Sequence, residues 1–353
     1  MKRKIANWGN YPVMESVELR ASVKPQLLQT LHDSDNIIAR GNGRCYGDAS
    51  LAPTTLSMLG YNKVTRFDAA AGVLECEAGL TLDRILELIV PNGWFLPVTP
   101  GTKFITVGGA VASDVHGKNH HVDGSFSAHI VDMDVLLASG AIENCSPTHN
   151  SQLFWATCGG MGLTGVITRV QFRLKRIETA YIRQKQIKAK NLEEVLALFE
   201  QYKHYTYSVA WIDCLKKGSG FGRSILILGE HATVQDLPPR QQSQPLALPR
   251  KRQINFPVTL PSFVLNPFTV SAFNFLYYHK NTRREISNVV SYEPFFYPLD
   301  AVLHWNRGYG PRGFVQYQFV LPLESKQGLI EILSRISEKG LASFLAVLKV
   351  FGE

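Results

Sequence analysis

Short apolar runs separated by glycine-rich loops predict mixed helices and strands in the first half of the chain. Thr81 opens a helical pattern that ends at Pro91-Asn92-Gly93, and Ser139-Gly140 is a hairpin turn between two apolar runs. The predicted helices are 24–32, 82–90 and 153–157, and the predicted strands are 17–23, 36–40, 73–78, 130–137, 141–145 and 166–174.

The pattern changes after residue 180. Asn191 is a plausible N-cap for a helix over 192–202, and Gly340 is placed to end a second helix over 325–339. The predicted strands of this half are 181–187, 207–213, 224–229, 314–320 and 344–351. A stretch rich in Pro and Gln, 235–257, is the best candidate for a mobile surface segment, and aromatic residues become frequent after it. We therefore expect an α+β protein with one domain over 1–177 and a second over 178–353, built on an antiparallel sheet flanked by helices.

The composition of the chain limits the class of protein and the kinds of ligand that we expect. The chain has 353 residues, of which 45% are hydrophobic, with a formal net charge of +8. The positive charge fits a solvated surface, an anionic ligand or an anionic membrane face, and no nucleic-acid motif is present. The basic N-terminus has no apolar stretch behind it, so we expect no secretory signal and a cytoplasmic protein. The five cysteines lack metal-type spacing and are expected to be reduced.

A glycine-rich loop follows the strand predicted at 36–40. Three glycines within seven residues leave backbone amides uncovered, and such a nest binds phosphate. The spacing matches neither the P-loop nor the Rossmann fingerprint, and a plain glycine turn remains the alternative. The loop consists of Ala39, Arg40, Gly41, Asn42, Gly43, Arg44, Cys45, Tyr46, Gly47, Asp48 and Ala49.

Two further glycine-rich loops occur in the same half. The second, over 99–121, has small residues suited to a flat ligand and then a polar run from Asp114 to His121. The third, over 159–165, could equally be a helix C-terminus with a tight entry into a strand. An extended cofactor lying between subdomains would use all three loops. A metal site is disfavoured because His120 and His121 are adjacent and would face opposite sides of a strand.

The three loops resemble the FAD-binding domain of the vanillyl-alcohol-oxidase/PCMH flavoproteins. The most specific part of the resemblance is the run His116-Gly117-Lys118-Asn119-His120-His121, whereas the first loop alone is typical of the whole superfamily. Other matching segments are Trp8-Gly9, Phe154 to Thr157, Tyr207 to Trp211, Pro298 to Asp300, Trp305 to Arg307, Gln316 to Gln318 and Lys349 to Phe351. The resemblance runs from Asn7 to the end of the chain and implies a PCMH-type domain of two α/β subdomains.

The resemblance also implies residue roles. FAD would be held non-covalently, because the first loop lacks the histidine that attaches the cofactor in some relatives. His116 and Lys118 would be catalytic, with His116 accepting or orienting the hydroxyl proton and Lys118 stabilising negative charge. The cofactor would contact residues 39–49, Gly101, Thr102, Thr106, Val107, Gly108, Gly109, Ser113, Asp114, Val115, His116 and Ile167. The substrate would contact Tyr46, His116, Lys118, Gln316, Gln318, Lys349 and Phe351. From the residues alone, Lys118 could be a surface lysine, and the two glutamines a solvent-facing side of a strand.

The implied reaction is oxidation at C2' of a polyprenyl-phosphate-linked ribose, the first half of an epimerisation used in cell wall biosynthesis. A separate keto-sugar reductase would be a partner, and peripheral contact with the inner membrane is expected. Two alternatives stay open: oxidation of a soluble polyol or aldonolactone, and a truncated, non-catalytic flavin-binding fragment. The family continues for roughly a hundred residues beyond Glu353, including a flavin-facing lysine, so we expect the second domain to be incomplete.

Overall fold

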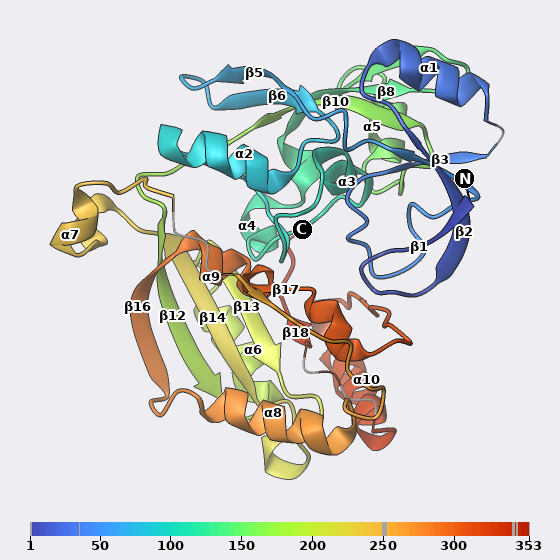
Figure 1. Ribbon diagram of the computed structural model, residues 1–353. Coiled ribbons are helices and arrows are strands. Elements are labelled where there is room, and N and C mark those ends of the chain that lie inside the picture. The colour runs from blue at the N-terminus through green and yellow to red at the C-terminus, as the bar shows by residue number, and fades with distance from the viewer. Residues whose placement is uncertain (1, 35, 249–252, 341–342, 344, 353) are drawn as a thin grey trace.

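The computed structural model describes residues 2–34, 36–248, 253–340, 343 and 345–352. Helices combine with sheets whose strands are mostly antiparallel, so the fold is α+β. In Figure 1 the elements of the first half, blue to green, form the upper part of the molecule, and most of those of the second half form the lower part.

The first sheet has the strand order β1-β2-β4-β3. Strands β2, β4 and β3 run parallel, and helix α1 (Lys24–His32) buries Leu27 against Leu56 of β4. Because parallel strands end at a common edge, the first glycine-rich loop, which follows β3, starts at that edge. The strands are β1 (Lys2–Ala6), β2 (Val13–Arg20), β3 (Ile37–Arg40) and β4 (Thr54–Ser57).

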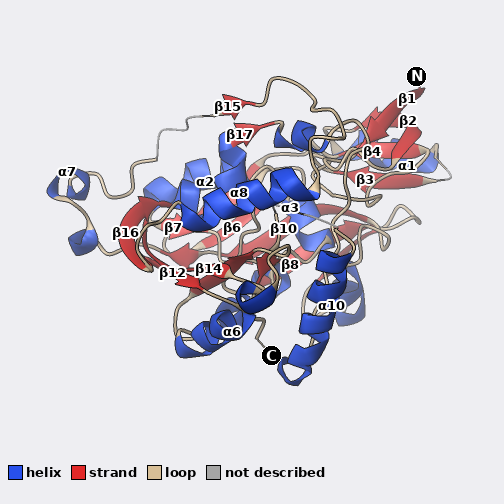
Figure 2. Cartoon of the chain, turned by 90° about the horizontal axis from the view of Figure 1, so that it is seen from below, coloured by secondary structure: helices blue, strands red, loops and turns tan. Residues whose placement is uncertain are grey.

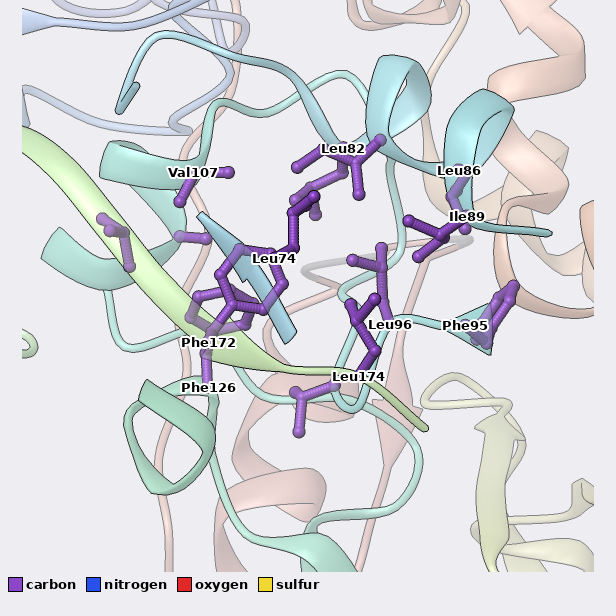
Figure 3. Packing of buried hydrophobic residues seen from close by; sticks show 14 of the residues in the cluster. Leu74, Leu82, Leu86, Ile89, Phe95, Leu96, Val107, Phe126, Phe172 and Leu174 are labelled. Atoms are coloured by element: carbon purple, nitrogen blue, oxygen red, sulfur yellow. The ribbon is translucent and has the colours of Figure 1, made fainter. Parts of the chain in front are cut away.

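The second sheet is antiparallel, in the order β5-β6-β10-β8-β9. Leu82, Leu86 and Ile89 repeat along one side of helix α2, and this side packs into the core around Leu74 and Leu96 (Figure 3). The strands are β5 (Val64–Asp68), β6 (Val73–Glu77), β8 (Ile130–Leu136), β9 (Ile142–Cys145) and β10 (Val166–Arg173). The helices are α2 (Leu82–Ile89), α3 (Val107–Ala112), α4 (His120–Asp123) and α5 (Ser151–Thr157), and β7 (Trp94–Phe95) pairs with β11 (Lys175–Arg176).

The third sheet, also antiparallel, has the order β16-β12-β14-β13-β18. Helices α6 and α10 pack on one of its faces through Val195 and Leu333. The strands are β12 (Tyr181–Ala189), β13 (Tyr207–Ile212), β14 (Ser224–His231), β16 (Glu285–Ser291) and β18 (Val347–Leu348). The helices are α6 (Leu192–Gln201), α7 (Pro239–Gln242), α8 (Pro267–His279), α9 (Tyr292–Phe296) and α10 (Lys326–Glu338), and β15 (Ile254–Asn255) pairs with β17 (Val302–Leu303). Figure 2 shows α6, α8 and α10 from below.

Two strand predictions near the C-terminus need correction. Residues 314–320 form no strand; the amide of Phe314 instead donates to the carbonyl of Gly9 (2.7 Å), which draws the segment away from the third sheet. The strand predicted at 344–351 is only β18, and residue 344 lies outside the described residues. Within the segment 235–257, α7 and β15 are ordered elements, and Arg250 to Arg252 lie outside the described residues.

The predicted domain boundary after residue 177 falls in the connection between β11 and β12. The main hydrophobic cluster nevertheless crosses this point, because Tyr207, Tyr292 and Phe296 pack with Phe95 of the first half. The two halves therefore share a continuous core beside the loops of interest.

Candidate active site

The three glycine-rich loops lie against one another. The Asn42 side chain of the first loop donates to the carbonyl of Phe104 in the second (2.8 Å). The amide of Met161 in the third loop donates to the carbonyl of Ala112 at the end of α3 (2.8 Å). Segments that are separate in sequence thus border one region of the molecule.

The first loop is anchored from beneath by the N-terminal segment. The Asn7 amide donates to the carbonyls of Gly47 (2.8 Å) and Ala49 (2.6 Å). The Arg40 guanidinium donates hydrogen bonds to the Asn7 side chain and to the carbonyl of Ala6. Gly43, at φ +60°, lies directly over the Arg40 guanidinium. Arg40 therefore supports the loop from below, and the anion-binding groups of the loop are its amides.

Those amides are available to a ligand. Among the residues that the structure describes, no backbone carbonyl receives a hydrogen bond from the amides of residues 42–48. A cavity of about 540 Å³ at the edge of the first sheet is lined by Arg40, Gly41 and Asn42, together with residues of β1, β2 and β4, among them Glu18, and the residues just after β2 and β4. A run of free amides beside a cavity has the donor chemistry that a diphosphate requires.

Gly47 and Gly101 supply a second indication of a ligand. Neither has a positive φ, and no atom lies within 4 Å of the position that a Cβ would take at either residue. Neither backbone conformation nor packing accounts for glycine there, whereas close approach by a flat ligand would. The residues present therefore fit FAD.

The second loop is fixed by residues from the second half of the chain. Asp300 accepts hydrogen bonds from the Thr102 hydroxyl (2.7 Å) and the Lys103 amide (2.9 Å), and the Lys103 ammonium pairs with Glu293. The hydroxyls of Thr99 and Tyr297 are 2.7 Å apart. Burial raises the pKa of Asp300, and the hydrogen bonds from Lys103 and Thr102 oppose this shift by stabilising the carboxylate. We call Glu293, Tyr297 and Asp300 the clamp.

Several residues that were predicted to bind the cofactor instead make hydrogen bonds or core contacts within the protein. Asp114 accepts hydrogen bonds from Ser125 and Ser127, and Gly108 donates its amide to the carbonyl of Ala78 (2.7 Å). Thr106 caps α3 through the amide of Gly109 (3.2 Å). The side chains of Val107 and Ile167 are buried in the core, and that of Val115 packs against it, whereas Ser113 is exposed. The side chains of Val107 and Ile167 are therefore not available to contact a cofactor.

The remaining residues of the first loop face aromatic side chains. The Arg44 guanidinium lies 4.0 Å from the ring centroid of Trp8, and the Tyr46 ring packs against Trp305 and Phe314. Burial raises the pKa of Tyr46 to about 12 and that of the Cys45 thiol above its usual range. Asp48 is exposed. Tyr46 and Cys45 are therefore neutral at physiological pH.

His116 is the centre of the predicted substrate residues. The Lys349 ammonium lies 2.8 Å from Nδ1 of His116, and the amide nitrogen of Gln318 lies 3.1 Å from Nε2. The Phe351 ring contacts the His116 ring edge-on and stacks on His120. Gln316 donates to Gln318 (3.3 Å), so both glutamines do lie on one side although the segment is not a strand.

Burial changes the proton affinities in this cluster. It lowers the pKa of His116 to about 4, assisted by the charge of Lys349. Burial likewise lowers the pKa of Lys349 to about 8 and that of Lys118 to about 7. His116 is thus neutral at neutral pH, and because a lysine ammonium only donates, Nδ1 accepts a hydrogen bond from Lys349.

Lys118 lies deeper in the protein than a residue that only contacts the substrate would need to lie. Its ammonium reaches the carbonyl of Phe296 (3.4 Å) and lies over the rings of Phe295 and Phe296. The carbonyl of Lys118 accepts from Ser208 of β13 (2.8 Å), which ties this segment to the third sheet. In the part of the chain that the structure describes, no group of three His, Cys, Asp or Glu side chains could hold a metal ion.

The sequence-based site missed the clamp. Asp300 was part of a matching segment, but nothing local in the sequence indicates that it contacts residues about two hundred positions earlier. The supporting role of Asn7 was missed for the same reason.

Comparison with known proteins identifies the family. A family model described as an FAD binding domain matches residues 27–146. Decaprenylphosphoryl-beta-D-ribose oxidase of Mycolicibacterium smegmatis is 37% identical over 323 residues, which cover 90% of this chain and 70% of that protein. The chain belongs to the PCMH-type FAD-dependent oxidoreductases.

Other similar proteins differ in how much of their length they share with the chain. An uncharacterized protein encoded in the mprA 5' region of Streptomyces coelicolor is 32% identical over 77% of this chain and 75% of its own length. The human Delta(24)-sterol reductase is 25% identical over 40% of this chain and 27% of its own length. The enzyme is thus an FAD-dependent oxidoreductase. No helix in the described part of the chain is long and apolar enough to cross a bilayer.

Proposed function

We propose that this enzyme oxidises a secondary alcohol of a sugar, at C2' of a polyprenyl-phosphate-linked ribose, as the first half of an epimerisation. A separate keto-sugar reductase would complete it. The relative from M. smegmatis is named for such a substrate, and two lysines beside His116 suit a phosphorylated one. The observation that carries the proposal is the cluster of His116, Gln318 and Lys349 near the FAD-binding loops, with Lys118 close enough for the charge of Lys349 to lower its pKa.

Lys118 and His116 have different roles toward the hydroxyl group of the substrate. Bound FAD would supply the acceptor for the hydride that leaves the carbinol carbon. Lys118, with a pKa of about 7, is partly neutral at physiological pH and accepts the hydroxyl proton. His116 has a pKa of about 4 and is too weak a base, so it orients the hydroxyl oxygen by a hydrogen bond. This assignment differs from the sequence-based prediction, in which His116 was the first choice to accept the hydroxyl proton and Lys118 stabilised negative charge.

FAD is proposed to be held non-covalently by the free amides of the first loop, with the second loop against the flavin ring. Residues 39–49 contain no histidine that could form a covalent link. Acid precipitation of the purified yellow protein should release all of the flavin into the supernatant. Flavin retained in the pellet would contradict non-covalent binding.

The central test is anaerobic mixing with a short-chain polyprenyl-phosphoryl ribose while the oxidised flavin absorbance is recorded. The wild type should bleach, and His116→Ala should keep its colour but bleach at least about a hundredfold more slowly. His149→Ala, which alters an exposed histidine, is the matched control and should bleach as the wild type does. Bleaching of His116→Ala at the wild-type rate would remove the role given to His116.

A second candidate is oxidation of a soluble aldonolactone. The putative D-arabinono-1,4-lactone oxidase of Neurospora crassa is 27% identical over 40% of this chain. Bleaching by small lactones or polyols, with none by the lipid-linked ribose, would favour this second function over the first.

A further inference from the structure

Helix α8 turns an apolar face to solvent. Phe268, Phe275 and Leu276 are 81%, 54% and 68% exposed. Their spacing, together with that of Ala272, places them within one stripe of about 100° along the helix. An exposed stripe of large apolar side chains is unusual on a soluble surface and marks an interaction site. We call these three large side chains the α8 outer face.

The opposite side of α8 is firmly anchored, which fixes the orientation of the helix. Val270 is buried, and the Asn274 amide donates to Asp213 at the end of β13 (2.8 Å). The Tyr278 hydroxyl donates to the carbonyl of Ala189 at the end of β12 (3.2 Å). The outer face therefore cannot turn inward without breaking these contacts.

The surroundings of α8 are basic. Residues 237–284 contain seven Lys and Arg residues and no Asp or Glu. Lys280 and Arg283 are exposed just beyond the end of α8, and Lys216 and Lys217 are exposed shortly after Asp213, which contacts Asn274. We call these four residues the basic rim. Positive charge around an apolar helical face complements an anionic lipid surface and disfavours a second copy of this basic chain.

We propose that α8 docks the enzyme onto an anionic membrane surface, with the α8 outer face entering the interface and the basic rim contacting lipid headgroups. The helix lies at the lower edge of the molecule, away from the first half, so docking there leaves the FAD-binding loops uncovered (Figure 1). The proposal is independent of the substrate, because the surface is separate from the His116 cluster.

Co-sedimentation of the purified holoenzyme with substrate-free vesicles tests the proposal. The enzyme should bind vesicles of equal parts phosphatidylglycerol and phosphatidylcholine, and bind pure phosphatidylcholine about tenfold more weakly. Combining Phe268→Ser, Phe275→Ser and Leu276→Ser should weaken binding to the anionic vesicles about tenfold or more. Lys216→Gln with Lys217→Gln should weaken it about tenfold, and added salt should do the same.

Two control variants distinguish this surface from general stickiness. Leu323→Ser removes another apolar side chain, which is 72% exposed, and Lys63→Gln with Arg66→Gln removes two exposed cations from the first half. Both should bind vesicles as the wild type does, and all variants should keep their flavin spectrum. Vesicle binding unchanged in the outer-face variant would overturn the proposal. So would a concentration-dependent dimer that this variant abolishes, because the outer face would then join two copies of the chain.

Discussion

His116, Lys118 and Lys349 lie close together, and burial shifts their three pKa values to different positions. The imidazole is held neutral, while each lysine is brought to within about one unit of neutral pH. Ordinary lysines are almost fully charged at this pH and could not serve as bases. A group whose pKa lies near the working pH transfers protons most effectively, which favours Lys118 for this role.

The first prediction concerns the pH dependence of kcat/KM. Lys118 must be neutral to accept a proton, so activity should rise as the pH passes about 7. Lys349 must be charged to hold the Nδ1 side of His116, so activity should fall as the pH passes about 8. A stopped-flow measurement of flavin reduction at low substrate concentration should give a bell between these values. Loss of the acid limb alone in Lys118→Met would support the assignment, and its persistence would contradict it.

The second prediction concerns stability. The pKa of Lys118 is lower in the folded protein than its ordinary value of 10.5, so only the unfolded chain binds this proton between about pH 7 and 10.5. The free energy of unfolding should therefore rise with pH across this window. Lys118→Met, which removes the buried charge, should raise Tm at pH 6 and have less effect at pH 10. An equal change in Tm at both pH values would show that the effect comes from packing.

At the scale of elements, the loops are positioned by contacts outside themselves. Asn7 holds the first loop by the carbonyls of Gly47 and Ala49, and Arg40 in turn binds Asn7 and the carbonyl of Ala6. Gly47 and Gly101 leave open space on the side where the cofactor is proposed to lie.

Substitution of these glycines separates folding from cofactor binding. Gly47→Ala and Gly101→Ala should leave the apoprotein as stable as the wild type or up to about 1 kcal/mol more stable, because neither site needs a positive φ. Each should weaken FAD binding, measured by the quenching of flavin fluorescence, because the methyl group enters the ligand space.

Gly140→Ala is the matched control. This glycine also has open space around it, but its φ of +85° in a surface hairpin makes alanine unfavourable. It should lower the apoprotein stability by about 1 kcal/mol and leave FAD affinity unchanged. Lower apoprotein stability with unchanged FAD affinity in Gly47→Ala would show that Gly47 does not line the cofactor site.

Elements specified by local signals were predictable from the sequence. Asn191 does cap α6 through the amide of Glu194, and β12, β13 and β14 lie where strands were predicted. Helix α8 was missed because apolar residues occur on every side of it, so no polar side alternates with them to reveal the helical period. The segment 314–320 has the alternation of a strand, but pairing depends on a distant partner, and Phe314 binds Gly9 instead.

At the scale of the whole molecule, the candidate site depends on both halves of the chain. The polar run around His116 was predictable because its residues are adjacent, whereas Lys349 and Gln318 were placed only by family resemblance. The clamp residues Glu293, Tyr297 and Asp300 connect the second half to the second loop. A change in the second half can thereby alter how the cofactor is held.

Asp300→Ala tests this connection. It should lower the free energy of unfolding by about 2–4 kcal/mol, because the Lys103 amide and the Thr102 hydroxyl lose a charged acceptor. FAD affinity should fall and the flavin absorbance maximum should shift, since the loop beside the ring is released. Asp33→Ala, at an exposed helix end, should change neither property. Normal flavin affinity and spectrum in Asp300→Ala would limit the clamp to a structural role.

The clamp also bears on the order of events during biosynthesis. A ribosome releases the FAD-binding loops early, but Asp300 emerges only after nearly two hundred further residues have been translated. The nascent first half can therefore fold its sheets while its second loop still lacks an anchor. Tight capture of the flavin must then wait until translation has passed that aspartate.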